Sequence, residues 1–136
     1  MSGEAVQGGN RGESLRAELT ALERMGLRYA VLAAWAQDLR GAGTALPSDV
    51  GSRLESARIK LSSGCYSSCD VGCDLGAVEG TLTAADATAG GRGVSFWLEL
   101  LARAMDPKAS VAGLLTIPAV RVYYQGCGFG PCGCSS

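Results

Sequence analysis

Apolar residues recur at helical spacing along most of the chain. Over residues 13–41 they follow alternating steps of three and four, interrupted only at Glu18, which is the pattern of one face of an amphipathic helix. The face comprises Leu15, Leu22, Met25, Tyr29, Leu32, Ala36 and Leu39. Gly41 and Gly43 follow it, and glycine is the residue that most often ends a helix. We therefore predict a helix over about 13–41, with Trp35 in the core.

A second helical pattern begins at Pro47, where a proline, a serine and an acidic residue form a typical helix start. One apolar face follows, made of Val50, Leu54, Ala57 and Leu61. Beyond this face every fourth residue is small, and we call this set the small-residue ridge: Gly64, Ser68, Gly72, Gly76 and Gly80. Residues four apart line up along a helix, so the ridge would allow a neighbouring backbone to approach closely.

The regular spacing predicts one helix over about 47–82, paired with the first helix as a long antiparallel hairpin. The ridge is then the closest contact between helices, or a surface for a protein partner or a second copy of the chain. A loop around the cysteines at 62–76 is the competing prediction, because each glycine costs about 1 kcal/mol relative to alanine inside a helix.

The rest of the chain predicts shorter elements packed on this hairpin. Residues 94–105 have a broad apolar face, with Ser95 as the expected cap and Pro107 ending the helix by Asp106. A fourth helix is expected from Asp106 to Ile117, before Pro118. Residues 119–125 are either extended or a last helical piece. The predicted fold class is thus mostly α.

Length and composition are those of one globular domain. The chain has 136 residues, of which 47% are hydrophobic and 18% charged, and its net charge is -1. We expect a flexible lead over 1–12, a helical domain over 13–125 and a cysteine- and glycine-rich tail over 126–136. No basic stripe points to nucleic acid. No apolar run reaches the roughly 18–20 residues of a membrane span, and the polar start predicts a cytoplasmic protein.

The chain contains no histidine. This excludes Ser–His and Cys–His catalytic pairs and every metal site that needs imidazole. No phosphate-binding or dinucleotide-binding glycine motif occurs either. The sequence therefore shows no recognisable catalytic constellation, which favours a non-enzymatic role over an enzyme, and we find no family that the sequence resembles.

Six cysteines are the main chemical signal, in two groups. Cys65, Cys69 and Cys73 follow one another at a spacing of four, and Cys127, Cys132 and Cys134 lie in the tail. In a reducing cytosol a cysteine cluster is more typical of metal binding than of structural disulfides. Because the first group offers only three thiolates where a closed site needs four, we predict that the tail folds back to supply another.

Geometry separates the candidate metals. On a straight helix the Cα atoms of Cys65 and Cys73 would lie about 12 Å apart, which is too far for both sulfurs to reach one zinc ion. An iron–sulfur cluster spreads its thiolates more widely and needs no histidine. It is the first prediction, with zinc or Cu(I) as alternatives.

The sequence therefore predicts a small metal-binding protein with a redox, electron-transfer or accessory-subunit role. Three carboxylates lie beside the cysteines in the sequence: Asp70, Asp74 and Glu79. They are predicted to be solvated helix surface, or groups that tune the metal site, or a docking patch for a partner. The alternative function is a helical structural or interaction module. In that case the cysteines are buried, or they are disulfide-bonded, since helical residues four apart have Cα atoms within disulfide range.

Overall fold

The structure is a computed structural model that describes residues 21–63, 68–88 and 93–127. These ranges contain five α-helices and one 3₁₀ helix and no β-strand, which confirms a mostly α fold. In chain order they are α3 (Ala21–Gly41), α4 (Ser48–Ser63), α5 (Ser68–Asp86), α6 (Val94–Met105), η1 (Leu114–Thr116) and α7 (Pro118–Gln125). The predicted lead over 1–12 lies outside the described residues.

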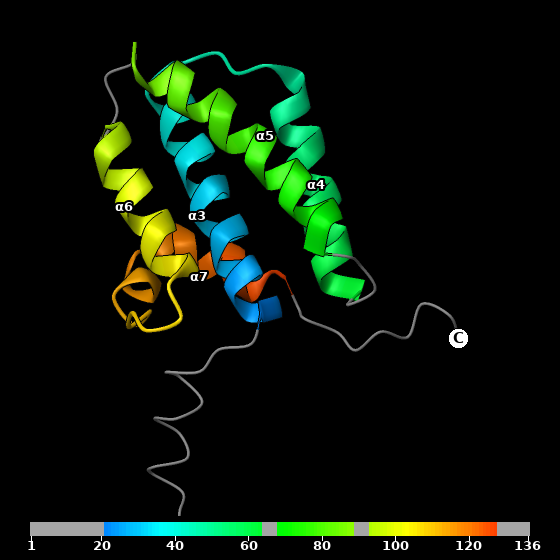
Figure 1. The fold of residues 1–136 in the computed structure, drawn as a ribbon. Helices are drawn as coiled ribbons and strands as arrows, with labels where there is room; N and C mark the ends of the chain where they lie inside the picture. Colours follow the sequence, from blue (N-terminus) through cyan, green and yellow to red (C-terminus); the bar gives the residue numbers. More distant parts are fainter. Residues whose placement is uncertain (1–20, 64–67, 89–92, 128–136) are drawn as a thin grey trace, which may run out of the picture.

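Helix α3 is the centre of the molecule, and α4, α5, α6 and α7 all contact it (Figure 1). Every residue from Tyr29 to Ala36 is buried. A helix that is apolar on all sides is a buried helix. The central stretch of α3 is therefore buried all around, whereas the sequence pattern predicted only one buried face. Four of these eight residues are alanines, whose small side chains allow neighbours to pack around the whole helix.

The connection from α3 to α4 follows the sequence prediction. Gly43 has a positive φ of 89°, and its N–H donates to the Arg40 carbonyl oxygen at 3.0 Å. Thr44 N–H reaches back to the Leu39 carbonyl oxygen at 2.9 Å, so the last carbonyls of α3 are satisfied. Pro47 then precedes the first residue of α4.

The prediction of one helix over 47–82 is wrong, because the chain turns back between Ser63 and Ser68. Helices α4 and α5 lie side by side (Figure 1). Asp74 accepts from Arg53 Nη1 at 3.4 Å and from Lys60 Nζ at 3.3 Å. On one continuous helix Arg53 and Asp74 would be about 31 Å apart, so these ion pairs require the turn.

Two matching apolar faces hold this pair of helices in the core. The buried residues are Val50, Leu54, Ala57 and Leu61 on α4, and Val71, Leu75, Val78 and Leu82 on α5. Both faces have steps of four, three and four residues, so the same helical register occurs on either side of the turn. The sequence period therefore gave no sign that the helix is interrupted.

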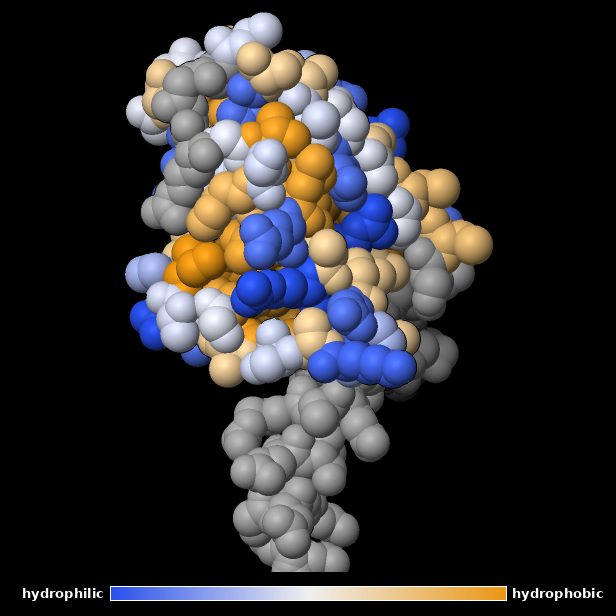
Figure 2. All heavy atoms as spheres, turned by 60° about the vertical axis from the view of Figure 1, so that its left-hand side comes forward, coloured by the Kyte–Doolittle hydropathy of each residue, from blue (hydrophilic) through white to orange (hydrophobic). Residues whose placement is uncertain are grey.

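Helix α6 has the predicted bounds, Val94–Met105, and Asp106 is its C-cap. Its N-cap is Gly93, with φ 106° and no side-chain cap, so Ser95 does not have the expected role. Trp97 is buried and stacks on Trp35 of α3, with ring centroids 6.1 Å apart. Figure 2 shows apolar residues in a band on the side of the molecule that carries α6.

The predicted helix from Asp106 to Ile117 is wrong. Lys108 N–H donates to Asp106 Oδ1 at 2.9 Å in a local turn, and only η1 is helical before Pro118. Pro118 begins α7, because the first position of a helix needs no N–H donor. Residues 119–125 are therefore helical, and Tyr123 of α7 packs edge-on against Tyr29 with centroids 6.3 Å apart.

None of the helices in the described ranges is both long and apolar enough to cross a bilayer.

Candidate metal centre

Three of the six predicted ligands lie in the described residues. Cys69 and Cys73 are exposed on α5, and Cys127 is buried after α7. Cys65, Cys132 and Cys134 lie outside the described ranges. Within those ranges no group of three or more Cys, Asp or Glu side chains is arranged to hold a metal ion.

Cys69 and Cys73 share one face of α5 because they are four residues apart. Side chains at this spacing have Cβ atoms about 5–6 Å apart. Two thiolates bound to one zinc ion have sulfurs about 3.8 Å apart, a separation that such side chains reach by tilting toward each other. The spacing of this pair is therefore compatible with two thiolate ligands on one metal ion, and a four-thiolate site stays a prediction.

The start of α5 at Ser68 changes the geometric argument against zinc. That argument assumed a helix through Cys65, Cys69 and Cys73, whereas only the last two lie within α5. The spacing of about 12 Å therefore no longer follows for Cys65 and Cys73. The choice between zinc and an iron–sulfur cluster stays a prediction.

Cys127 has the properties of a core residue. Its side chain is fully buried, and its Sγ donates to the Tyr123 carbonyl oxygen at 3.6 Å. Burial raises the pKa of this thiol to about 11, against the smaller lowering effect of the Arg58 charge. The thiol is protonated at neutral pH, whereas a metal ligand must be the thiolate.

The backbone of Cys127 anchors the beginning of the tail. Ser62 Oγ, in the last turn of α4, donates to the Cys127 carbonyl oxygen. Ser62 lies three residues before Cys65, so the two cysteine groups of the sequence begin from neighbouring points of the structure. The prediction that a tail cysteine meets Cys65, Cys69 or Cys73 concerns residues that the structure does not describe, and it stays a prediction.

Asp74 and Glu79, which follow the cysteines on α5, pair with cations of other helices. Asp74 bridges to Arg53 and Lys60 of α4, and its side chain is only 15% exposed. Glu79 pairs with Arg28 of α3 at 3.6 Å. Both carboxylates thus join helices, a structural role that was not among those predicted for them. Asp70 is exposed, and its role stays a prediction.

The small-residue ridge is not the closest contact between helices. A Cβ atom added at Gly72 or Gly80 would meet no atom within 4 Å, and one at Gly76 would meet Arg28 Nη2 at 3.9 Å. The prediction is wrong because α5 buries Val71, Leu75 and its other apolar residues instead. Gly64 lies outside the described residues.

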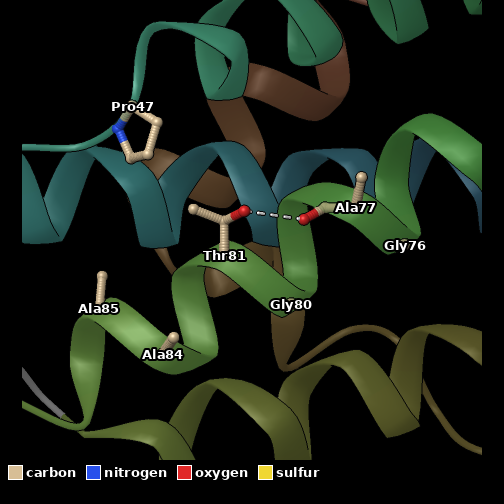
Figure 3. A pocket seen from close by; sticks show the side chains of 7 residues that line it. All are labelled: Pro47, Gly76, Ala77, Gly80, Thr81, Ala84 and Ala85. Atoms are coloured by element: carbon tan, nitrogen blue, oxygen red, sulfur yellow. Dashed lines mark hydrogen bonds between the residues drawn. The ribbon is translucent and has the colours of Figure 1, made fainter.

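Part of the ridge lines a shallow open groove of about 650 Å³ on α5 (Figure 3). Its walls are Pro47, Gly76, Ala77, Gly80, Thr81, Ala84 and Ala85. Thr81 Oγ1 donates to the Ala77 carbonyl oxygen at 3.1 Å, so its hydroxyl is directed to its own helix. The groove is an exposed surface, and its use by a protein partner or a second copy stays a prediction.

Sequence reasoning did not identify two buried charged residues. Asp86 is 4% exposed and accepts from Trp35 Nε1 at 2.7 Å, while Arg24 is 6% exposed and donates to the Ala104 carbonyl oxygen at 2.9 Å. Both continue a buried face at helical spacing: Asp86 follows Leu82 by four residues, and Arg24 precedes Leu27 by three. That spacing is the signal that could have revealed them.

No protein-family model, curated protein or solved structure matches this chain.

Proposed function

We propose that this protein binds an iron–sulfur cluster through Cys65, Cys69, Cys73 and one tail cysteine, Cys132 or Cys134. The cluster would have a redox or electron-transfer role, in this chain alone or as an accessory subunit of a larger enzyme. The observation that carries the proposal is the hydrogen bond from Ser62 to the Cys127 carbonyl oxygen, because it ties the start of the tail to the start of the first cysteine group.

Chain length supports a shared site. Cys65 follows Ser62 by three residues and Cys132 follows Cys127 by five, which allows spans of up to about 10 Å and 17 Å in extended chain. Cys134 has a reach of up to about 24 Å by the same rule. From a common anchor, these lengths allow Cys65 and a tail cysteine to meet at one site.

The amino end of α5 favours a negative charge at this position. A divalent centre held by four thiolates has a net charge of −2. Cys69 is the second residue of α5, and the amino end of a helix stabilises a nearby negative charge by about 0.3–1 kcal/mol. Exposure of Cys69 and Cys73 also suits electron exchange, because a donor or acceptor protein can approach them from solvent.

Cys127 is left out of the proposed ligand set. Its buried thiol has a pKa of about 11, and making it a ligand would require removing it from the core. Its proposed role is to fix the base of the tail.

A structural zinc ion is the second candidate. The end of α4 at Ser63 and the start of α5 at Ser68 support it, because the geometric objection to zinc required one straight helix through Cys65, Cys69 and Cys73. Zinc would stabilise the turn and the tail without redox chemistry.

Metal analysis of cysteine variants tests the proposal. Protein purified without oxygen should contain stoichiometric iron and sulfide with visible charge-transfer absorption. Cys69→Ser, Cys73→Ser and the double variant Cys132→Ser/Cys134→Ser should each lose most of the metal. Cys127→Ala is the matched control, since it also removes a thiol, and it should keep its metal as long as circular dichroism shows a folded helical protein.

One result would distinguish zinc from an iron–sulfur cluster, and another would exclude both. Colourless protein with one zinc per chain, lost in the same variants, would replace the cluster by zinc at the same site. Metal-free protein whose exposed thiols react freely after anoxic purification would exclude a metal function.

A further inference from the structure

Arg24 is a buried cation, and one edge of its guanidinium is unpaired within the described part of the chain. The residue is only 6% exposed, and its Nη1 donates to the Ala104 carbonyl oxygen, in the last turn of α6, at 2.9 Å. Its Nε and Nη2 are also buried, and neither has a hydrogen-bond partner among the described residues. Buried charged groups without partners are rare in native proteins, because leaving water without new hydrogen bonds is costly.

The two unpaired nitrogens indicate the chemistry of the missing ligand. In an arginine side chain one N–H bond of Nη2 runs parallel to the Nε–H bond, and this edge of the planar guanidinium matches the two oxygens of a carboxylate. The Ala104 carbonyl oxygen lies at the carboxyl end of α6 and carries only a partial negative charge. A carboxylate would satisfy both remaining donors and neutralise the cation in a single contact.

The sequence limits which carboxylates of this chain can supply that contact. It contains 13 Asp and Glu residues, and three of them lie outside the described ranges, all before α3: Glu4, Glu13 and Glu18. The acidic residues of the described ranges leave Nε and Nη2 of Arg24 unpaired. Among the side chains of this sequence, a carboxylate for this edge therefore comes from residues 1–20.

The guanidinium lies close to the point where these residues join α3. Side chains of an α-helix lean toward its amino end, so Arg24 extends over the turn that precedes it. Glu18 precedes Ala21 by three residues, which allows a span of up to about 10 Å in extended chain. It reaches the edge only where the chain leaves helical geometry before Ala21, because residues six apart on one helix lie on different faces. Glu13 and Glu4 need a longer return of the chain, which costs more loop entropy.

We propose that the free edge of Arg24 binds a glutamate carboxylate of residues 1–20 and thereby fastens this segment to the junction of α3 and α6. One guanidinium then joins three parts of the chain, through the Ala104 carbonyl oxygen and the bound carboxylate. The pair needs no metal, so it stands apart from the proposed function.

Double-mutant cycles on the full chain test the pair. Glu18→Gln, Glu13→Gln and Glu4→Gln are each made in the wild type and in an Arg24→Met background, and urea midpoints are measured. One of the three should lower the midpoint of the wild type by roughly 1 M, because the buried guanidinium loses its carboxylate. The same replacement should leave the midpoint of Arg24→Met unchanged.

Glu99→Gln is the matched control. It removes the same charge from an exposed glutamate of α6 that pairs with Arg103, so it should act equally in both backgrounds. A second measurement applies even where Arg24→Met does not fold. In NMR spectra of protein with ¹⁵N-labelled arginine, the Arg24 Nε–H signal, assigned by its loss in Arg24→Lys, should shift in the same glutamate variant and stay in place in the other two.

Two results would overturn the proposal. One is the absence of coupling between Arg24 and each of the three glutamates, with the Arg24 Nε–H signal unchanged in all three variants. The other is a urea midpoint that rises with added phosphate in the wild type and not in Arg24→Met, because the edge would then be open to a free anion.

Discussion

Asp86 places a carboxylate inside the core, at the end of α5. One oxygen accepts from Trp35 Nε1, and Trp35 in turn stacks on Trp97 of α6. The hydrogen bond thus links the last turn of α5 to the central helix. In the described part of the chain, the other carboxylate oxygen, Asp86 Oδ1, has no hydrogen-bond partner, and neither does Trp97 Nε1. The hydrogen bond to Trp35 is therefore the main interaction that offsets the free-energy cost of burying the Asp86 carboxylate.

Replacing Asp86 with alanine should destabilise the fold by about 1–3 kcal/mol, because the buried Trp35 N–H loses its acceptor. In a Trp35→Phe background the same replacement should cost less, since no N–H is left unpaired. Urea unfolding of the wild type, both single variants and the double variant measures this coupling. Equal costs in the two backgrounds would show that the hydrogen bond contributes nothing.

The raised pKa values of one buried thiol and two tyrosine hydroxyls predict that the free energy of unfolding falls at high pH. Burial raises the pKa of Cys127 to about 11 from 9.0, and the pKa values of Tyr29 and Tyr124 to about 12 from 10.0. Between the ordinary and the raised pKa, the unfolded chain has lost the proton and the folded chain retains it. The unfolded state binds fewer protons there, so the free energy of unfolding decreases as pH rises.

The contribution of Cys127 is therefore complete below about pH 9 and is lost as pH rises toward 11. Urea midpoints measured from about pH 8 to pH 11 should decline, and Cys127→Ala should reduce the decline above pH 9. A midpoint that stays constant over this range, with the helices intact, would contradict the buried environment of this thiol.

At the level of elements, α5 shows which features residue spacing predicted and which it did not. Its helical state was predicted, but the buried face was not, because the sequence analysis placed the packing contact on the small-residue ridge and not on Val71, Leu75, Val78 and Leu82. The interruption before Ser68 did not follow, because the spacing of small residues and cysteines continues unchanged through Ser63 and Ser68. The competing prediction of a loop over 62–76 is also wrong for Cys69 and Cys73, which lie within α5. Residues 64–67 lie outside the described ranges.

The glycines of α5 should be replaceable. A Cβ at Gly72 meets no atom within 4 Å, so Gly72→Ala should stabilise the protein by about 0.5–1 kcal/mol through reduced entropy of the unfolded chain. Gly80→Ala should behave in the same way. Thermal unfolding in dilute solution measures both variants, and a lower melting temperature would mean that the small-residue ridge packs closely against another surface.

At the level of the whole molecule, local signals predicted the fold better than they predicted the site. The bounds of α6 were predicted to the residue, since Gly93 and Pro107 bracket its apolar face. The end of α3 and the start of α4 followed from glycine and proline in the same way. Helix content and the core positions of Trp35 and Trp97 also followed from the pattern.

The candidate site depended on packing that no local pattern encodes. Cys127 looked like its neighbours in the tail, but the end of α7 carries it into the core beside α4. Asp74 looked like a solvated group, but the turn before α5 brings Arg53 and Lys60 to it. In both cases the environment is set by residues distant in sequence.

The central claim is that thiolates at the start of α5 and in the tail hold one metal centre. X-ray absorption spectroscopy at the metal edge of anoxically purified protein tests it most directly. A shared thiolate centre should show sulfur neighbours only, four per metal at about 2.3 Å, with a metal–metal distance in addition for an iron–sulfur cluster. Protein without stoichiometric metal, or a metal surrounded by oxygen or nitrogen, would contradict it.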